Sequence, residues 1–215
     1  RGIKKIKKIK KKFSNKEYLK IKKKFGFELT NDQKIAIGEI NKDLKSNQKM
    51  FRLLQGDVGS GKTIVALITS INVISSGFQV SLMAPTEILA KQHYNLAKKL
   101  FDEDINIKIL TSKTEYRERN EILKDLINGS INILIGTHSL FQEKIKYNNL
   151  GLIIIDEQHK FGVKQRKKLS DKGGKNCDIL VMSATPIPRT MIMTVFGDMD
   201  TSIIKNKPKN RKEIK

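Results

Sequence analysis

The stretch LLQGDVGSGKTIVAL, residues 53–67, constrains the fold of this chain more than any other. An apolar run of strand character comes first, a glycine-rich loop follows, and the last part has the pattern of an amphipathic helix. Four residues separate Gly56 from Gly61, which Lys62 and Thr63 follow, and this is the spacing of a phosphate-binding loop. A chance glycine-rich turn is the alternative, but a strand before and a helix after are the flanks that the motif requires. The stretch therefore predicts an α/β domain with a phosphate site at the end of a strand.

The residue types in this loop suit phosphate chemistry. Glycines let the backbone turn tightly, so that successive amide N–H groups point at a di- or triphosphate, and the following helix presents the positive end of its dipole. The predicted loop contacts are Gly56, Gly59, Ser60 and Gly61. Lys62 is expected to bridge the β- and γ-phosphates as a catalytic cation, and the Thr63 hydroxyl is expected to hold Mg²⁺. The loop thus predicts ATP and Mg²⁺ as cofactors.

Strands and helices alternate along the rest of the chain. Strands are expected at about 50–55, 78–83, 106–110, 131–135, 151–155, 178–182 and 201–205. Helices are expected at about 30–46, 62–75, 86–100, 115–128 and 189–196, with shorter turns after His138 and Val163. Runs such as NILIG and LIIID are continuous apolar stretches apart from one polar residue at an end, which indicates strands that are buried on both faces. The pattern predicts an α/β fold, a parallel β-sheet flanked by helices on both faces.

A second polar group of residues follows the apolar strand at 151–155. Asp156 and Glu157 stand where this strand ends, and ligands of parallel sheets bind beyond the carboxyl ends of the strands. Carboxylates at a strand end are also common helix caps, so the pattern gains its meaning from the phosphate loop upstream. In that context Asp156 is expected to bind Mg²⁺ through water, and Glu157 to orient and deprotonate the attacking water.

Positive charge is concentrated at the start of the chain. The formal net charge is +21, and residues 1–28 hold 13 Lys/Arg and two Glu, a net of +11. Apolar residues recur every three or four positions from Ile3 to Phe13, which predicts a basic amphipathic helix, with a second short helix from Ser14 to about Lys24. Basic segments of this kind bind polyanions, most often nucleic acid, although a solvated lysine face is the alternative.

Other features exclude several classes of protein. The single cysteine, Cys177, excludes an internal disulfide and a multi-cysteine metal site; it fits a reducing cytoplasm and is expected in the core. No apolar run approaches the roughly 18 residues that a membrane span needs, so no membrane partner is expected.

His93 is interpreted as a surface or packing histidine. The chain starts at Arg1 and ends in the polar run NKPKNRKEIK, and it therefore reads as a piece of a longer protein.

Together, these motifs resemble the first motor lobe of superfamily 2 helicases. The motifs are LTNDQ, GDVGSGKT, PTEILAKQH, GTHSL, DEQHKFGVKQR and SATPIPRT, and the last two resemble the RecG family of ATP-dependent DNA helicases in particular. The resemblance covers about residues 25–205 and implies a RecA-like P-loop NTPase fold. It implies an enzyme that hydrolyses ATP to move on branched double-stranded DNA, in replication fork reversal and Holliday junction branch migration during recombination and repair.

The resemblance also divides the chain and assigns roles to further residues. Residues 1–28 would be a basic helical connector from a missing N-terminal wedge domain, 29–205 the ATP-binding lobe, and 206–215 the start of a linker to a missing second lobe. Gln33 would read the adenine edge, Phe27 would stack on the base, and His159 would contact the γ-phosphate. The implied DNA contacts are Thr86, Glu87, Thr111, Thr137, His138 and Arg189. Where relatives often carry Thr-Gly-Ser, this chain has Thr111, Ser112 and Lys113, so a contact there would rest on Thr111 alone.

Two alternatives stay open for the function. A transcription-repair coupling type of double-strand DNA translocase shares the TPIPRT-type string, and a non-enzymatic nucleic-acid-binding module with a decayed P-loop would also show the basic charge. The absent second lobe would supply the arginine fingers, each of which contributes about 10³- to 10⁵-fold in rate, so this stretch alone is expected to be weak or inactive. The protein is expected to be a monomer and to be located in the bacterial cytoplasm, at the nucleoid.

Overall fold

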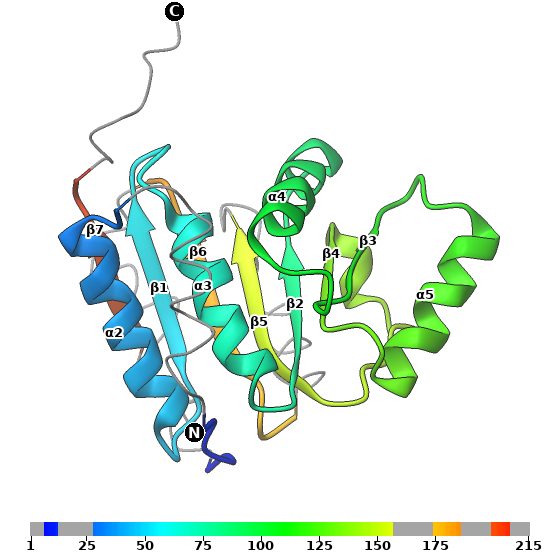
Figure 1. Ribbon diagram of the computed structural model, residues 1–215, viewed down its shortest axis with the longest axis horizontal. Coiled ribbons are helices and arrows are strands. Elements are labelled where there is room, and N and C mark those ends of the chain that lie inside the picture. The colour runs from blue at the N-terminus through cyan, green and yellow to red at the C-terminus, as the bar shows by residue number, and fades with distance from the viewer. Residues whose placement is uncertain (1–6, 13–27, 157–173, 186–198, 207–215) are drawn as a thin grey trace, which may run out of the picture.

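The computed structural model describes residues 7–12, 28–156, 174–185 and 199–206. Seven parallel strands form one sheet in the order β3-β4-β2-β5-β6-β1-β7 (Figure 1). The strands are β1 (Phe51–Gly56), β2 (Gln79–Met83), β3 (Ile107–Leu110), β4 (Ile133–Gly136), β5 (Leu150–Asp156), β6 (Asp178–Ser183) and β7 (Asp200–Ile204). The helices are α2 (Asn31–Lys45), α3 (Lys62–Ile74), α4 (Glu87–Leu100), α5 (Tyr116–Asn128) and the 3-10 turn η2 (His138–Phe141).

The two faces of the sheet build two hydrophobic clusters. In β5, Leu152 and Ile154 point to one cluster, whereas Ile153 and Ile155 point to the other, because successive side chains of a strand alternate between faces. Helices α2, α3 and α4 cover the first face, and α5 with η2 contributes to the second. The predicted parallel sheet with helices on both faces is therefore confirmed.

Element boundaries fall within one or two residues of the sequence prediction. All seven predicted strands exist, and so do the predicted helices that begin near residues 30, 62, 86 and 115. The short turn after His138 is η2. The helices predicted at 14–24 and 189–196 and the turn after Val163 lie outside the described residues.

Residues 7–12 are not helical, so the predicted amphipathic helix is wrong for this part of the chain. They form an extended strap, whose Lys7 makes an antiparallel bridge to Gln48. The strap reverses the expected burial, because Ile9 is 60% exposed while the Lys8 and Lys11 side chains are 0% exposed. The physical reason is a buried carboxylate, Asp178, which both lysines reach.

This charged cluster lies at the amino ends of the strands. Asp178 Oδ1 is 2.6 Å from Lys8 Nζ and accepts from the Met50 amide at 2.7 Å, and Asp178 Oδ2 is 2.5 Å from Lys11 Nζ. Burial lowers the pKa of the Lys8 ammonium, and the Asp178 carboxylate offsets part of this effect. The Lys11 Nζ also stands 4.9 Å from the centroid of the Phe78 ring. We call Lys8, Lys11 and Asp178 the strap cluster.

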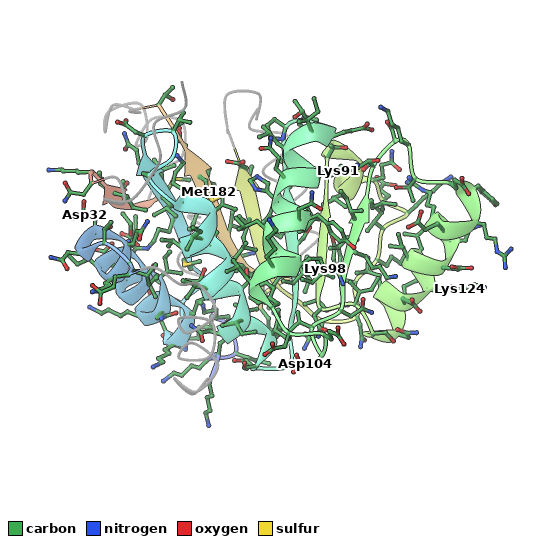
Figure 2. All side chains as sticks on the ribbon, turned by 45° about the horizontal axis from the view of Figure 1, so that its top comes forward. Asp32, Lys91, Lys98, Asp104, Lys124 and Met182 are labelled. Carbon is green, nitrogen blue, oxygen red and sulfur yellow. The ribbon has the colours of Figure 1, made fainter. Side chains whose placement is uncertain are left out.

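Two further features lie at opposite ends of the sheet. Cys177 is buried as expected, and burial raises the pKa of its thiol to about 12. At the other end of the sheet, Asp32 in the first turn of α2 accepts hydrogen bonds from the Lys205 and Asn206 amides, both at 2.9 Å, and thereby fixes α2 beside the end of β7 (Figure 2). Among the residues described, no helix is long and apolar enough to cross a membrane.

Candidate nucleotide and DNA site

The carboxyl ends of all seven strands lie at one edge of the sheet, because every pairing is parallel. The loop after β1, Asp156 at the end of β5 and Ser183 at the end of β6 therefore gather at this edge. Neighbouring strands bring Thr86 after β2 and Thr137 after β4 to the same edge. This arrangement matches the general rule that ligands of open α/β sheets bind beyond the carboxyl ends of strands.

The loop after β1 has the backbone of a phosphate cradle. Gly59 and Gly61 have φ of 81° and 87°, a conformation that glycine adopts without steric cost. Gly61 is the N-cap of α3 and provides no side-chain hydrogen bond, so no capping side chain competes for the first amide N–H groups of the helix. An anion is a natural partner for such a helix terminus. The backbone thus fits the triphosphate that the sequence predicted.

Lys62 lies folded back along this loop. Its Nζ donates to the carbonyl oxygens of Gly56 at 2.6 Å and Asp57 at 3.0 Å. Beneath the loop the Ser60 hydroxyl is buried and has no hydrogen-bond partner among the described residues, and a Cβ on Gly56 would stand 2.7 Å from it. A side chain at position 56 would therefore push this hydroxyl and the loop apart, which explains why the position is a glycine.

Gln33 ties the start of α2 to the phosphate loop. Its Oε1 accepts from the Thr30 amide at 2.9 Å while the Thr30 hydroxyl accepts from the Gln33 amide at 3.3 Å, a reciprocal capping box. Its Nε2 donates to the Ser60 carbonyl at 2.8 Å, and a Cβ on Gly61 would clash with the same nitrogen. The residue is 1% exposed. Gln33 was predicted to contact adenine, and the structure adds two contacts within the protein.

Asp156 ends β5 in a buried position and contacts a residue that sequence reasoning did not place in the site. His93 Nε2 lies 2.6 Å from Asp156 Oδ2, and the two side chains are 8% and 11% exposed. The interpretation of His93 as a surface or packing histidine is therefore incomplete: it is buried, and it has a polar partner in the predicted metal site. One signal was available, since His93 interrupts the apolar stripe that Ala90, Ala97 and Leu100 form at helical spacing.

The start of α4 is built from predicted DNA contacts. The Thr86 hydroxyl is exposed and caps the helix, accepting from the Leu89 amide at 3.3 Å. Glu87 faces the loop after β3: its Oε1 accepts from the Ser112 hydroxyl at 2.5 Å and from the Ser112 amide at 3.2 Å, and its Oε2 is 3.6 Å from Lys113 Nζ. These hydrogen bonds from Ser112 lower the pKa of the Glu87 carboxyl. Glu87 thus joins two loops at the carboxyl edge.

The other described candidates stand along the same edge. Thr111 is buried and its hydroxyl accepts from the Lys113 amide at 3.2 Å, so this side chain supports a turn. Thr137 precedes η2, and His138 is exposed. The Ser183 hydroxyl donates to the Thr185 carbonyl at 3.1 Å. Phe27, Glu157, His159 and Arg189 lie outside the described residues.

The donor set at Asp156 suits Mg²⁺ as the sequence predicted, because carboxylate, hydroxyl and water oxygens are its preferred ligands. The structure describes no group of three or more His, Cys, Asp or Glu within the residues it covers that would hold a metal by protein ligands alone. This agrees with the way Mg²⁺ is usually bound at nucleotide sites, through one or two protein ligands, waters and the phosphates of the substrate. Asp156 ends β5 and Thr63 lies in the first turn of α3, and each carries an oxygen of the kind that Mg²⁺ prefers.

Residues 30–194, most of the chain including the phosphate loop and Asp156, match the DEAD/DEAH box helicase family. The chain belongs to this family. The chain is also similar to individual helicases of known name. It is 50% identical over 207 residues to the ATP-dependent DNA helicase RecG of Bacillus subtilis, which covers 96% of this chain and 30% of the relative. It is 51% identical over 193 residues to the RecG of Aquifex aeolicus, which covers 89% of this chain and 24% of that protein.

Solved helicase structures share the fold. The structure of RecG bound to a three-way DNA junction superposes with a TM-score of 0.84 at 44% identity, over 98% of this chain and 28% of that chain. The helicase MrfA bound to DNA gives a TM-score of 0.67 at 17% identity, over 96% of this chain and 31% of that chain, and it supports the fold alone. The sheet is thus the RecA-like helicase fold that the resemblance implied. The chain spans less than a third of the RecG proteins cited here.

Proposed function

We propose that this chain is the ATP-binding motor lobe of a RecG-like DNA helicase that acts on branched double-stranded DNA. Such an enzyme would drive replication fork reversal and Holliday junction branch migration in recombination and repair. The observation that carries the proposal is the meeting of a glycine cradle at the start of α3 with the Asp156 carboxylate at one sheet edge, in a chain about half identical to RecG helicases.

Each residue of the nucleotide site would have a distinct role in ATP hydrolysis. The amides of Gly59, Ser60 and Gly61 would bind the phosphates, and Lys62 would leave the loop carbonyls to reach the β- and γ-phosphates. Thr63 and Asp156 would hold Mg²⁺, which supplies charge neutralisation on the phosphates when bound. Glu157 would accept the proton of the attacking water, and His159 would contact the γ-phosphate.

Gln33 would recognise adenine through the hydrogen-bonding groups of its buried amide. An amide side chain has two N–H donors and two acceptor positions on its oxygen. Among the described residues, the capping box uses one acceptor position of this amide and the Ser60 carbonyl uses one donor, so one of each stays available. An amide can pair with adenine through such a donor and acceptor set. Gln33 would then couple the base to the phosphate loop, with Phe27 stacked on the ring.

The DNA backbone would lie along the carboxyl edge. Thr86, Thr137, His138 and Arg189 offer hydroxyl, imidazole and guanidinium groups, and helix N-termini add backbone amides, all of which suit phosphate contacts. Thr111 and Glu87 would support this surface indirectly, because Thr111 holds its own turn and the Glu87 carboxylate, which repels phosphate, holds the Ser112 loop. These contacts position the motor on DNA and read no sequence.

The lobe would work with other parts of its protein. A wedge domain would recognise the junction, and a second motor lobe would complete the ATP site with arginine fingers. Lobe closure would convert hydrolysis into movement. The cited relatives are bacterial proteins, so we place the enzyme in the cytoplasm at the nucleoid, acting as a monomer on each junction.

Steady-state ATP hydrolysis tests this proposal, measured on the protein expressed from its complete gene. Equal concentrations of a synthetic fork, linear duplex and single strand are compared. We expect the fork to stimulate hydrolysis most strongly, because the motor engages a duplex arm beside the junction. Equal stimulation by linear duplex would favour a transcription-repair coupling type of translocase instead.

A Glu157→Gln variant separates the enzyme from a binding module. Loss of the general base should lower kcat by about 10² or more while nucleotide binding persists. The matched control is Glu103→Gln, a carboxylate in the loop before β3, which should hydrolyse ATP at the normal rate. Normal hydrolysis by Glu157→Gln would contradict the role of Glu157 as the general base. No ATP hydrolysis by the unchanged protein, with or without DNA, would favour the decayed P-loop alternative.

A further inference from the structure

His93 is a buried polar residue that the proposed mechanism does not use. It lies on the face of α4 that packs on the sheet, opposite the exposed Lys91 and Lys98 (Figure 2). A buried imidazole without a partner costs free energy, and an alanine or leucine would pack in this stripe at no such cost. The polar partner is Asp156, with Nε2 to Oδ2 at 2.6 Å.

We propose that His93 is a positioning residue for Asp156, the carboxylate that holds Mg²⁺. This inference rests on the proposed function of the nucleotide site. Asp156 ends β5, and His93 projects from α4, which follows the neighbouring strand β2. The contact therefore connects two elements that are 63 residues apart in the chain.

The geometry shows what His93 does to the carboxylate. An ionised carboxylate only accepts hydrogen bonds, so the imidazole Nε2–H is the donor. A hydrogen bond to Oδ2 restrains rotation of the carboxylate, and Oδ1 would then be the oxygen that binds the metal or a water bound to it. Groups that hydrogen-bond a metal ligand orient it, and their loss typically lowers metal affinity by about 10- to 100-fold.

The proposal gives His93 a role in Mg²⁺ binding and none in the binding of metal-free nucleotide. It therefore predicts that a change at His93 affects ADP affinity only when Mg²⁺ is present. Without metal, ADP would be bound by the phosphate loop; among the described residues, the hydrogen bond of the His93 side chain goes to Asp156 and not to that loop. With metal, Asp156 adds its contribution through Mg²⁺. A change at His93 should therefore leave ADP affinity in EDTA unchanged and reduce the gain in affinity that Mg²⁺ provides.

The test uses the protein expressed from its complete gene and a fluorescent ADP analogue titrated in EDTA and in increasing Mg²⁺. His93→Leu puts an apolar side chain of similar size in this position and removes the donor. His93→Gln restores an N–H donor near the position of Nε2. Leu100→Ala, on the same buried stripe of α4, is the control for lost packing. Should the leucine variant be insoluble, His93→Ala takes its place.

We expect His93→Leu to need about tenfold more Mg²⁺ for half-maximal tightening of ADP binding. We expect His93→Gln to need about the wild-type amount, and Leu100→Ala to lower Tm without moving the Mg²⁺ midpoint. In His93→Leu, the Mg²⁺ concentration that gives half-maximal ATP hydrolysis should rise by the same factor. At saturating Mg²⁺ the KM for ATP of this variant should equal the wild-type value.

Three results would overturn the inference, and they fall into two kinds of failure. A wild-type Mg²⁺ midpoint in His93→Leu, or an equal shift in Leu100→Ala, would assign His93 to packing and leave the proposed function intact. No Mg²⁺ dependence of ADP binding in the wild-type protein would instead overturn the proposed nucleotide site, and this inference with it. The two failures are therefore distinguishable.

Discussion

At the scale of single residues, buried polar side chains form the hydrogen bonds that link the elements of this domain. Gln33 shows this most directly, because each end of its amide has a different partner. The oxygen caps α2 through the Thr30 amide, and the nitrogen fixes the phosphate loop through the Ser60 carbonyl. Helix capping alone would need only the oxygen, so the choice of amide over carboxylate at this position is explained by the loop.

Gln33→Glu tests this division. A glutamate keeps the oxygen that caps α2, but its second oxygen would face the Ser60 carbonyl. The Ser60 carbonyl oxygen and this second glutamate oxygen would then both lack a donor. We expect urea unfolding to show a loss of about 1–3 kcal/mol, the cost of an unsatisfied buried group, together with weaker ADP binding. Gln48→Glu, at an exposed position, is the control and should change stability by no more than about 0.5 kcal/mol. Unchanged ADP affinity in Gln33→Glu would remove the link to the phosphate loop.

At the scale of elements, two glycines differ in whether the backbone conformation requires a glycine. Gly129 ends α5 with a φ of 87°, and a Cβ there would lie 2.8 Å from Asn148 Nδ2. Gly38 lies inside α2, and a Cβ there would have no neighbour within 4 Å. The same chemical change should therefore have opposite effects at the two positions.

We predict that Gly38→Ala stabilises the domain and Gly129→Ala destabilises it. Alanine favours a helix interior over glycine by about 0.5–1 kcal/mol, whereas a non-glycine residue held in the left-handed region costs about 1–3 kcal/mol. Thermal unfolding should show Tm rising in the first variant and falling in the second. Each variant is the control for the other, and shifts of the same sign would contradict the explanation.

At the scale of the whole molecule, the strap cluster joins the first described residues to the sheet. Lys8 and Lys11 reach Asp178 from 170 and 167 residues away, at the edge of the sheet opposite the nucleotide site. The Lys8 and Lys11 amides also donate to the Asn47 and Leu44 carbonyls, so the strap follows the end of α2. The strap is thereby fixed to both α2 and the sheet.

Asp178→Asn should be strongly destabilising. Asparagine can still accept from the Met50 amide, but two buried ammonium groups would lose their counter-charge, and breaking a buried ion pair typically costs about 3–5 kcal/mol. Urea unfolding of the 215-residue chain measures the change. Asp104→Asn, at an exposed loop position labelled in Figure 2, is the control and should stay within about 0.5 kcal/mol. A loss no larger than that of the control would mean that the ion pairs of the strap cluster contribute little.

The sequence by itself determined the sheet, its helices and the phosphate loop, since these follow from local patterns. Strands such as β5 are apolar on both faces, and the loop needs only glycines at fixed spacing followed by Lys62 and Thr63. Tertiary structure decided the partners of buried polar groups. The lysines of the strap looked like a helical surface, yet Asp178 draws two of them inside, because a buried carboxylate requires compensating charge. His93 looked like a packing residue, yet the fold brings Asp156 to it, because strand order sets which distant side chains meet.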